Sequence, residues 1–259
     1  MKRLLNVILL LGLLLIIFLD FRMEAAQKQR HLEQARTTQP MLVVVVPKGE
    51  RRQFVLPDST MVWLNAASTL SYPPNMGEKT RTVELTGEAF FAVKRELQQP
   101  FRVRSRDIQI EVLGTRFSLR DYPEEAICRT MVAEGAIRLK HNDTSAVLET
   151  GEEAQLDLAT FSGSVLTVRS GIDTAETAPW TRGLLQFDHA DLATMLRELS
   201  RAFNVEMRFE GRLPDVRFSG SFPLDQSLED IIQGLDFHNM HVRMRRAGAN
   251  IVIVSAIPA

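Results

Sequence analysis

The sequence has little cysteine, little excess charge and no familiar motif for catalysis or nucleotide binding. Its single cysteine, Cys128, cannot form a disulfide within the chain, so packing must stabilise the fold. The 31 Lys and Arg residues nearly balance the 32 Asp and Glu residues, which argues against a nucleic-acid partner. Neither a Gly-rich phosphate loop nor a nucleophile elbow occurs in the sequence. We therefore predict no enzyme of these classes and no cofactor.

Metal-ligating residues are also sparse. His238 and His241 are three residues apart, but no cluster of Cys, Asp or Glu lies near them in the sequence. A structural or catalytic metal site needs three or four such ligands. The sequence therefore predicts no bound metal.

Only one long apolar run is present, at the amino terminus. Residues 4–19 are apolar apart from Asn6 and follow the basic pair Lys2 and Arg3, as in a membrane-inserting segment. Charged residues come directly after the run, where a signal-peptide cleavage site would need small residues. We predict an uncleaved anchor at 1–21, followed by a polar stalk at 22–40. Basic residues are more numerous after the run than before it, so the positive-inside count does not by itself place the rest of the chain outside the cytoplasm.

Residues 41–168 alternate between polar and apolar positions in short segments, which predicts an all-β domain. Turn residues separate the segments, and a sandwich, a barrel or a solenoid-like stack would all fit this spacing. Pro57, Asp58 and Ser59 are expected to reverse the chain. Gly87, together with the residue before it, is expected to form a turn between strands at 81–85 and 88–93.

The pattern changes in the last third of the chain. Residues 169–179 lack periodicity and are rich in Ser, Gly, Asp, Thr and Pro, which predicts a linker. Residues 180–259 then read strand, helix, strand, and repeat that order before a last strand, which predicts a small α+β module. Asp188 is the expected N-cap of the first helix and Asn204 its end. The predicted fold class is therefore mainly β with a C-terminal α+β domain.

Short motifs lie between residues 46 and 93, namely Pro47, Gly49-Glu50, Leu56-Pro57-Asp58, Thr60 to Asn65, Arg81 to Leu85 and Gly87 to Val93. These motifs resemble those of FecR-like proteins. A second resemblance is to the C-terminal domain of such proteins of the Bacteroidetes type, which is similar to the STN domain of secretins and transducers. It rests on Trp180, Gly183, Leu185, Phe187, Leu192, Leu196, Leu199, Asn204, Val205, Phe218, Ser219, Gly220, Phe222, Leu228, Ile231, Leu235 and Ile251. The resemblance implies a β-helix-like or jelly-roll-like first domain and an STN-like βαβ-βαββ second domain.

The resemblance also implies a function. Proteins of this family pass a signal from a TonB-dependent outer-membrane transducer through the periplasm to a cytoplasmic sigma factor. The implied protein is a single-pass bacterial inner-membrane protein whose periplasmic part binds the signalling domain of the transducer. In the family the sigma-binding part precedes the membrane helix, whereas only three residues precede the apolar run here. We therefore expect an extracytoplasmic-function sigma factor to be reached through a separate cytoplasmic protein, unless the chain relays to another membrane partner or residues are missing upstream.

One possible reaction follows from the resemblance, because some family members cleave themselves at a Gly-Thr bond. Here the bond would be Gly114-Thr115, with the Thr hydroxyl attacking the Gly carbonyl and water splitting the resulting ester. A glycine bulge before a strand explains the same two residues, and we favour that interpretation. Apart from this bond, we predict no enzyme activity.

By analogy with the family, the C-terminal domain is expected to bind the transducer. The candidate contact is an exposed strand edge formed by Ile251, Val252, Ile253 and Val254. Arg243 and Arg245 are a candidate docking patch, although a polar hairpin face would explain them as well. The alternative function is a membrane-anchored carbohydrate-binding or structural scaffold protein. The first of these would need a cleft with convergent polar groups, which the sequence does not indicate.

Overall fold

The computed structural model describes residues 40–78, 80–142, 144–158, 165–211, 213–235, 242–248 and 250–256. The predicted anchor at 1–21 and the stalk at 22–40, apart from its last residue, lie outside these residues, as do His238 and His241. Neither α-helix in the described part of the chain is long and apolar enough to cross a membrane.

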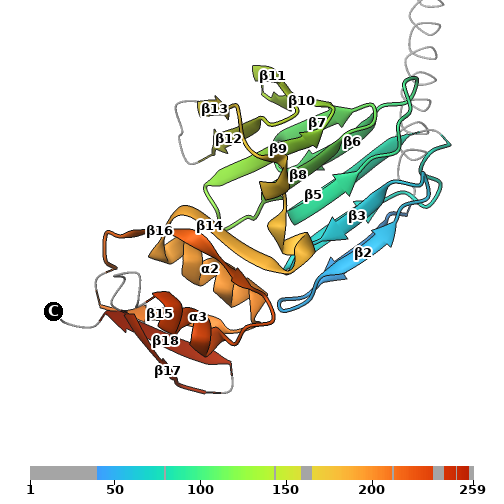
Figure 1. Cartoon of the computed structure of the whole chain (residues 1–259). Coiled ribbons are helices and arrows are strands. Elements are labelled where there is room, and N and C mark those ends of the chain that lie inside the picture. Colours follow the sequence, from blue (N-terminus) through green and yellow to red (C-terminus); the bar gives the residue numbers. More distant parts are fainter. Residues whose placement is uncertain are drawn as a thin grey trace, which may run out of the picture. The chain divides into compact units, whose positions relative to one another are not determined.

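The first part of the described chain is a β domain. Its strands, within the described residues, are β1 (Leu42–Val46), β2 (Arg52–Val55), β3 (Met61–Leu64), β4 (Ser68–Tyr72), β5 (Arg81–Ala92), β6 (Phe101–Ser105), β7 (Ile108–Val112), β8 (Arg116–Asp121), β9 (Ile127–Glu134), β10 (Ala136–His141), β11 (Thr144–Glu149), β12 (Glu153–Asp157) and β13 (Val165–Arg169). They form one sheet, with the order β11-β10-β7-β6-β5-β8-β9-β12-β13 and with β1-β4 and β2-β3 joining at β5. The sheet curves into a nearly closed, barrel-like structure (Figure 1).

The barrel-like sheet is one of the three architectures that the strand spacing left open. It corrects the β-helix or jelly roll that the family resemblance implied. A β-helix stacks parallel strands, whereas every recorded strand pair among the described residues of this domain is antiparallel except β5–β6. The predicted all-β character is confirmed, because alternating burial along the strands follows the alternating sequence.

β5 is the strand that joins the two halves of the sheet. Its first half pairs with β4 and β6, and its second half pairs with β3 and β8. The turn predicted at Gly87 is therefore wrong, because β5 runs through this position without a break. Gly87 has a φ of 106°, and a Cβ there would lie 2.3 Å from Oγ of Ser68. Glycine is required for this close approach and marks a bend within the strand.

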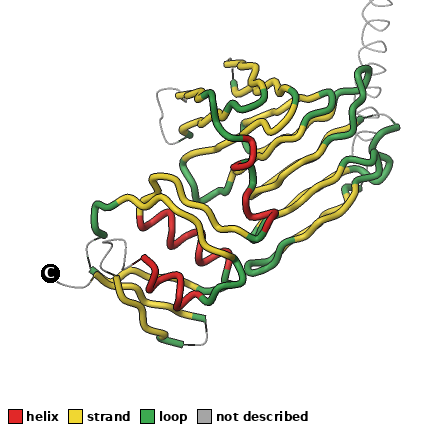
Figure 2. The backbone as a smooth tube through the Cα atoms, in the orientation of Figure 1, coloured by secondary structure: helices red, strands yellow, loops and turns green. Residues whose placement is uncertain are grey.

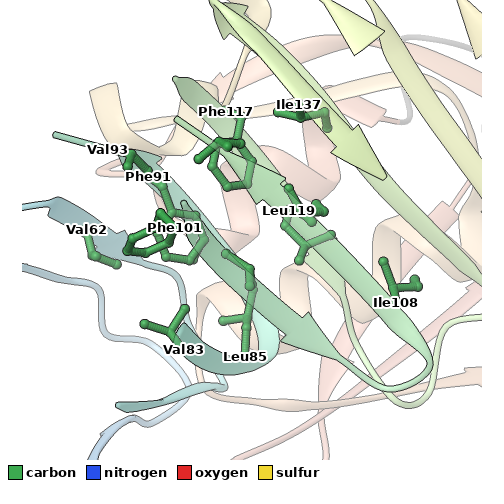
Figure 3. Close-up of a cluster of buried hydrophobic side chains, with 14 of the residues drawn as sticks. Val62, Val83, Leu85, Phe91, Val93, Phe101, Ile108, Phe117, Leu119 and Ile137 are labelled. Carbon is green, nitrogen blue, oxygen red and sulfur yellow. The ribbon is translucent and has the colours of Figure 1, made fainter. Parts of the chain in front are cut away.

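Apolar side chains from both halves of the sheet fill the interior. Phe91 on β5 packs against Phe101 and Phe117, with ring centroids 5.8 and 5.2 Å apart. Figure 3 shows these rings with Val62 and Leu119 in one cluster. Cys128 is buried in the same core, and burial raises the pKa of its thiol. The core of the β domain therefore packs without a disulfide.

The turn predicted after β2 is confirmed. Leu56 donates its backbone N–H to the carbonyl of Thr60 at 2.8 Å, and Oδ1 of Asp58 accepts the backbone N–H of Thr60 at 3.0 Å. The same carboxylate forms a buried ion pair with Arg81, at 2.8 Å. Ser59 adopts a left-handed φ of 70°. A serine in this conformation stores about 1 kcal/mol of strain.

The second part of the described chain is an α+β domain. Two short 3-10 helices, η1 (Thr174–Glu176) and η2 (Pro179–Arg182), precede it. Its elements are β14 (Leu184–Asp191), α2 (Leu192–Ala202), β15 (Glu206–Glu210), β16 (Arg217–Pro223), α3 (Leu228–Leu235), β17 (Val242–Arg246) and β18 (Ile251–Ala256). This order confirms the predicted βαβ-βαββ pattern. β14 pairs with β16, and β15-β18-β17 form a second sheet. Figure 2 shows the helices of this domain in red and its strands in yellow. Side chains of the two helices and both sheets share one core.

The start of α2 differs from the prediction. Asp191, not Asp188, is the N-cap, and its Oδ1 accepts the backbone N–H of Thr194 at 2.7 Å. β14 continues past Asp188 because its register with β16 shifts between Phe187 and Ala190. The predicted end at Asn204 is confirmed, since that residue has a left-handed φ of 52° directly after the C-cap.

We expect the substitution Ser59→Gly to raise the free energy of unfolding of the full-length chain by about 0.5 kcal/mol. Relief of about 1 kcal/mol of left-handed strain outweighs the greater entropy that glycine gives the unfolded chain. Ser59 is exposed, so no packing is lost. Urea unfolding in detergent measures the change. The matched control Ser145→Gly, at an exposed strand position of β11, should instead destabilise the protein. Equal effects of the two substitutions would contradict the strain argument.

Candidate functional site: a charged junction between the two domains

Gly114 and Thr115 lie directly before β8, in a tightly packed position. A Cβ on Gly114 would lie 2.6 Å from Cα of Arg95, so the backbones approach too closely for any other residue. Thr115 is buried, and its hydroxyl donates a hydrogen bond to the carbonyl of Ala136 at 2.7 Å. A carbonyl acceptor cannot take up the hydroxyl proton as a general base would. Packing and this hydrogen bond account for both residues, and self-cleavage between them remains untested.

The residues predicted to form an exposed strand edge are not at an edge. Ile251, Val252, Ile253 and Val254 belong to β18, which pairs with β15 on one side and β17 on the other. Val252 and Val254 are fully buried. Since the backbone groups of β18 are paired on both sides, this strand cannot add to a partner sheet. Within the described residues, the free edges of this sheet are β15 and β17.

Arg243 and Arg245 lie on β17, so the structure does place them on an edge strand. Both are exposed, and Arg245 forms an ion pair with Glu210 of β15 at 2.7 Å. Next to them, Arg246 pairs with Glu229 of α3 at 2.7 Å. The β17 edge therefore carries a row of basic side chains. Their role in binding stays a prediction.

A metal centre is not apparent in the described part of the chain. Among these residues, no group of three or more His, Cys, Asp or Glu side chains is arranged to hold an ion.

The densest polar constellation lies where the β domain meets the α+β domain, and we call it the charged junction. It is defined by Glu88, Arg120, Tyr122, Glu124, Glu125, Trp180, Glu198 and Arg201. These residues come from β5, from β8 and the loop after it, from η2 and from α2. None of them was predicted from the sequence as part of a site.

Trp180 anchors one side of the charged junction. Its ring packs with Phe90 of β5 in a small apolar cluster that includes Trp63 and Leu224, so both domains contribute. Its Nε1–H donates to Oε1 of Glu88 at 2.9 Å. The other oxygen of Glu88 accepts a hydrogen bond from Asn65 at 2.8 Å. A buried carboxylate is thereby provided with donors on both oxygens.

Arg120 occupies the centre of the charged junction. Its guanidinium lies 2.7 Å from Glu125, 2.9 Å from Glu198 and 3.5 Å from Glu88. Two of these carboxylates belong to the β domain, and Glu198 belongs to α2. One buried cation therefore binds carboxylates of both domains.

Arg201 of α2 provides the second contact between the domains. Its guanidinium binds Glu124 and Glu125, each at 2.7 Å, and lies 3.9 Å from the ring centroid of Tyr122. Its backbone carbonyl accepts the N–H of Gly49 at 2.8 Å. Arg201 is almost completely buried, so its charge depends on these partners.

The titration behaviour shows how strongly these charges interact. Burial lowers the pKa of Arg120, but Glu198, Glu88 and Glu125 outweigh burial and raise it well above its ordinary value. Burial would raise the pKa of Glu125, yet Arg120 and Arg201 bring it below its ordinary value. For Glu198, burial raises the pKa and Arg120 offsets only part of that effect. The guanidinium of Arg120 therefore remains charged, and the charged junction depends on ionic pairing.

A cavity of about 600 Å³ adjoins the charged junction, and residues of both domains line it. Arg51 lines it from the β domain, and its Nε has no hydrogen-bond partner. Gln186 and Glu198 line it from the α+β domain. The carboxylates and guanidiniums around it bind mainly each other, so the arrangement is suited to coupling two domains.

Sequence reasoning missed the charged junction because its residues are far apart in the chain. Arg201 and Glu124 are separated by 77 positions, and Trp180 and Glu88 by 92. Arg201 is also a charged residue among the apolar residues that α2 buries, namely Leu192, Met195, Leu196 and Leu199, so periodicity gives no sign that it is buried. A tryptophan directly after the polar, aperiodic segment at 169–179 was the one available signal.

Comparison with known proteins agrees with this architecture. A family model described as FecR protein matches residues 43–138, and one described as FecR, C-terminal, matches residues 184–253. Two crystal structures, at 1.65 and 2.50 Å, of a candidate anti-sigma factor from Parabacteroides distasonis ATCC 8503 are similar to this chain. In each case the identity is 25%, the TM-score is 0.77, and the alignment covers 84% of this chain and 100% of the other. A comparison with curated proteins finds no match.

We expect Arg201→Met to lower the free energy of unfolding by about 2–3 kcal/mol. The substitution keeps much of the apolar volume but leaves the buried carboxylate of Glu125 with one cation fewer. Urea unfolding of the full-length chain measures the loss. The matched control is Arg197→Met on the same helix, where an exposed side chain hydrogen-bonds Thr194 and the change should stay below about 0.5 kcal/mol. Equal losses at both positions would contradict a special role for the charged junction.

Proposed function

The chain belongs to the FecR family, and from that premise we propose that it relays a signal in an anti-sigma system. The similarity to a candidate anti-sigma factor along the whole length of that chain supports this proposal. The family is not a family of enzymes, which agrees with the prediction of no general catalytic activity. The observation that carries the proposal is the charged junction, because it couples a partner-binding domain to a second domain.

In this proposal the chain is a single-pass protein of the bacterial inner membrane, with residues 1–21 as its anchor and the two domains in the periplasm. The apolar run supports the anchor. The nearly balanced charge of the chain agrees with a protein partner better than with nucleic acid. A sigma factor would be regulated through a separate cytoplasmic protein.

The proposed partner in the periplasm is the signalling domain of a TonB-dependent outer-membrane transducer. Its proposed docking edge is β17, with Arg243 and Arg245 in contact with the partner. A free strand edge can accept a strand from another chain, and its side chains select which strand. A strand with acidic side chains would complement the basic row on β17.

Transmission would pass through the charged junction. α2 carries Glu198 and Arg201, and the same helix packs against β14 and β15 in the α+β domain. A movement of α2 on partner binding would therefore change the distances from its charged side chains to Arg120 and Glu125 in the β domain. Buried ion pairs tolerate little displacement, because each separated charge loses its compensation.

The test is calorimetric titration of the full-length chain, in detergent, with a purified signalling domain of a TonB-dependent transducer from the same cell. We expect binding, and at least a tenfold weaker affinity for the double variant Arg243→Glu/Arg245→Glu. The matched control Arg138→Glu, at an exposed position of the β domain, should leave the affinity unchanged.

Three outcomes would contradict the proposal. They are no binding of any such signalling domain by the full-length chain, equal affinities of wild type and the double variant, or tight binding to a glycan alone. The last result would instead support the carbohydrate-binding alternative.

A further inference from the structure

β1 is an edge strand with an unusual surface. It pairs with β4 on one side, and no described strand pairs with its other side. Its sequence is Leu-Val-Val-Val-Val, and the exposed fractions of Leu42, Val43 and Val45 are 47%, 57% and 62%. Large apolar side chains are thus exposed along a row of unpaired backbone groups. Such an edge is a template for adding another strand.

The other edges of the same sheet are built differently. Within the described residues these edges are β2, β11 and β13, and each carries charged or polar side chains. β2 has Arg52 and Gln53, β11 begins with Thr144 and Ser145 and ends in Glu149, and β13 ends in Arg169. Charges of this kind keep edge strands in water and apart from one another. β1 has no charge, proline or bulge, so it lacks the protection that the other edges have.

We propose that β1 pairs antiparallel with β1 of a second copy of this chain, centred on Val44. In this register Val43 of one copy lies opposite Val45 of the second copy, and Val45 of the first lies opposite Val43 of the second. These four valines form one group on the outer face of the sheet. Successive side chains of a strand point to opposite faces, so these two positions share one face. Directly opposite β-branched residues stabilise a sheet. The pairing covers one side of each of the two most exposed valines of β1.

Self-pairing fits β1 better than pairing with a different chain. An all-apolar strand is complementary to itself, and a two-fold axis gives both copies the same contact. The proposed transducer contact lies on the basic edge of β17, which is chemically unlike β1. The two edges therefore need not compete for one partner.

The proposed membrane anchor favours the same occupant, and this step alone rests on the proposed function. Anchored copies share one bilayer, which raises their effective concentration. Residues 20–41 separate the apolar run from β1, and a segment of this length spans up to about 70 Å when extended. The two strand ends of an antiparallel pair lie only about 17 Å apart. Both anchors can therefore reach the same membrane.

The first test is sedimentation equilibrium of the full-length chain in density-matched detergent. We expect a reversible dimer, and at least a tenfold higher dissociation constant for Val45→Lys. The matched control is Val55→Lys on β2, where an edge valine has a similar exposed fraction of 58%. This control should dimerise as the wild type does, and thermal unfolding midpoints confirm that both variants fold.

The second test fixes the register by disulfide formation in a Cys128→Ala background. Chains with Val43→Cys and chains with Val45→Cys are co-expressed at full length under different tags. Opposite Cβ atoms lie about 4.5–5.5 Å apart and diagonal ones about 7–8 Å apart, so the mixed disulfide should exceed both same-residue disulfides. A dimer held together only by contacts between the apolar runs at 4–19 would show no excess of the mixed disulfide.

The proposal is overturned if the wild type stays monomeric at all concentrations, if Val45→Lys dimerises normally, or if no mixed disulfide forms in excess. None of these measurements includes a transducer. Failure here and failure of the proposed function are therefore separate results.

Discussion

The buried guanidinium of Arg120 is the constraint on which the relation between the two domains depends. A charge removed from water is costly unless partners compensate it, and here Glu88, Glu125 and Glu198 surround it. One of those carboxylates is on α2, so the α+β domain must be in place for the β domain to keep this charge buried. Arg201 provides the reciprocal dependence, because its partners lie on the β domain. Each domain completes the charge pairing of the other.

The backbone of β5 determines where this pairing occurs. The bend at Gly87 directs the strand from one half of the sheet to the other, and Ser68 accepts the backbone N–H of the next residue, Glu88, at 2.9 Å. Glu88 is thereby held where Trp180 and Arg120 reach it. A small residue that allows two strands to approach closely thus positions a carboxylate of the charged junction. The charge pairing of Glu88 therefore depends on the geometry of the sheet.

The sequence predicts local structure well and non-local pairing poorly, and particular residues show why. Alternation and helical spacing predicted the strands and the βαβ-βαββ order, because both depend on neighbours in the chain. Gly87 was misassigned because a glycine is compatible with a turn or with a bend inside a strand. Asp188 was misassigned because a bulge extends β14. The apolar run of β18 could not show that β15 and β17 would pair on both of its sides. The charged junction depends on contacts across 77 and 92 positions, which no local pattern encodes.

The free edges of the two sheets differ in chemistry, and this difference determines what each can recognise. β17 presents arginines, so association there would depend on an acidic partner and would weaken with salt. β1 presents valines, so association there would depend on burial of apolar surface and would be insensitive to salt. Because the charged junction joins the domain of β17 to the domain of β1, the proposed relay would carry a signal received at the basic edge to the proposed pairing at the apolar edge.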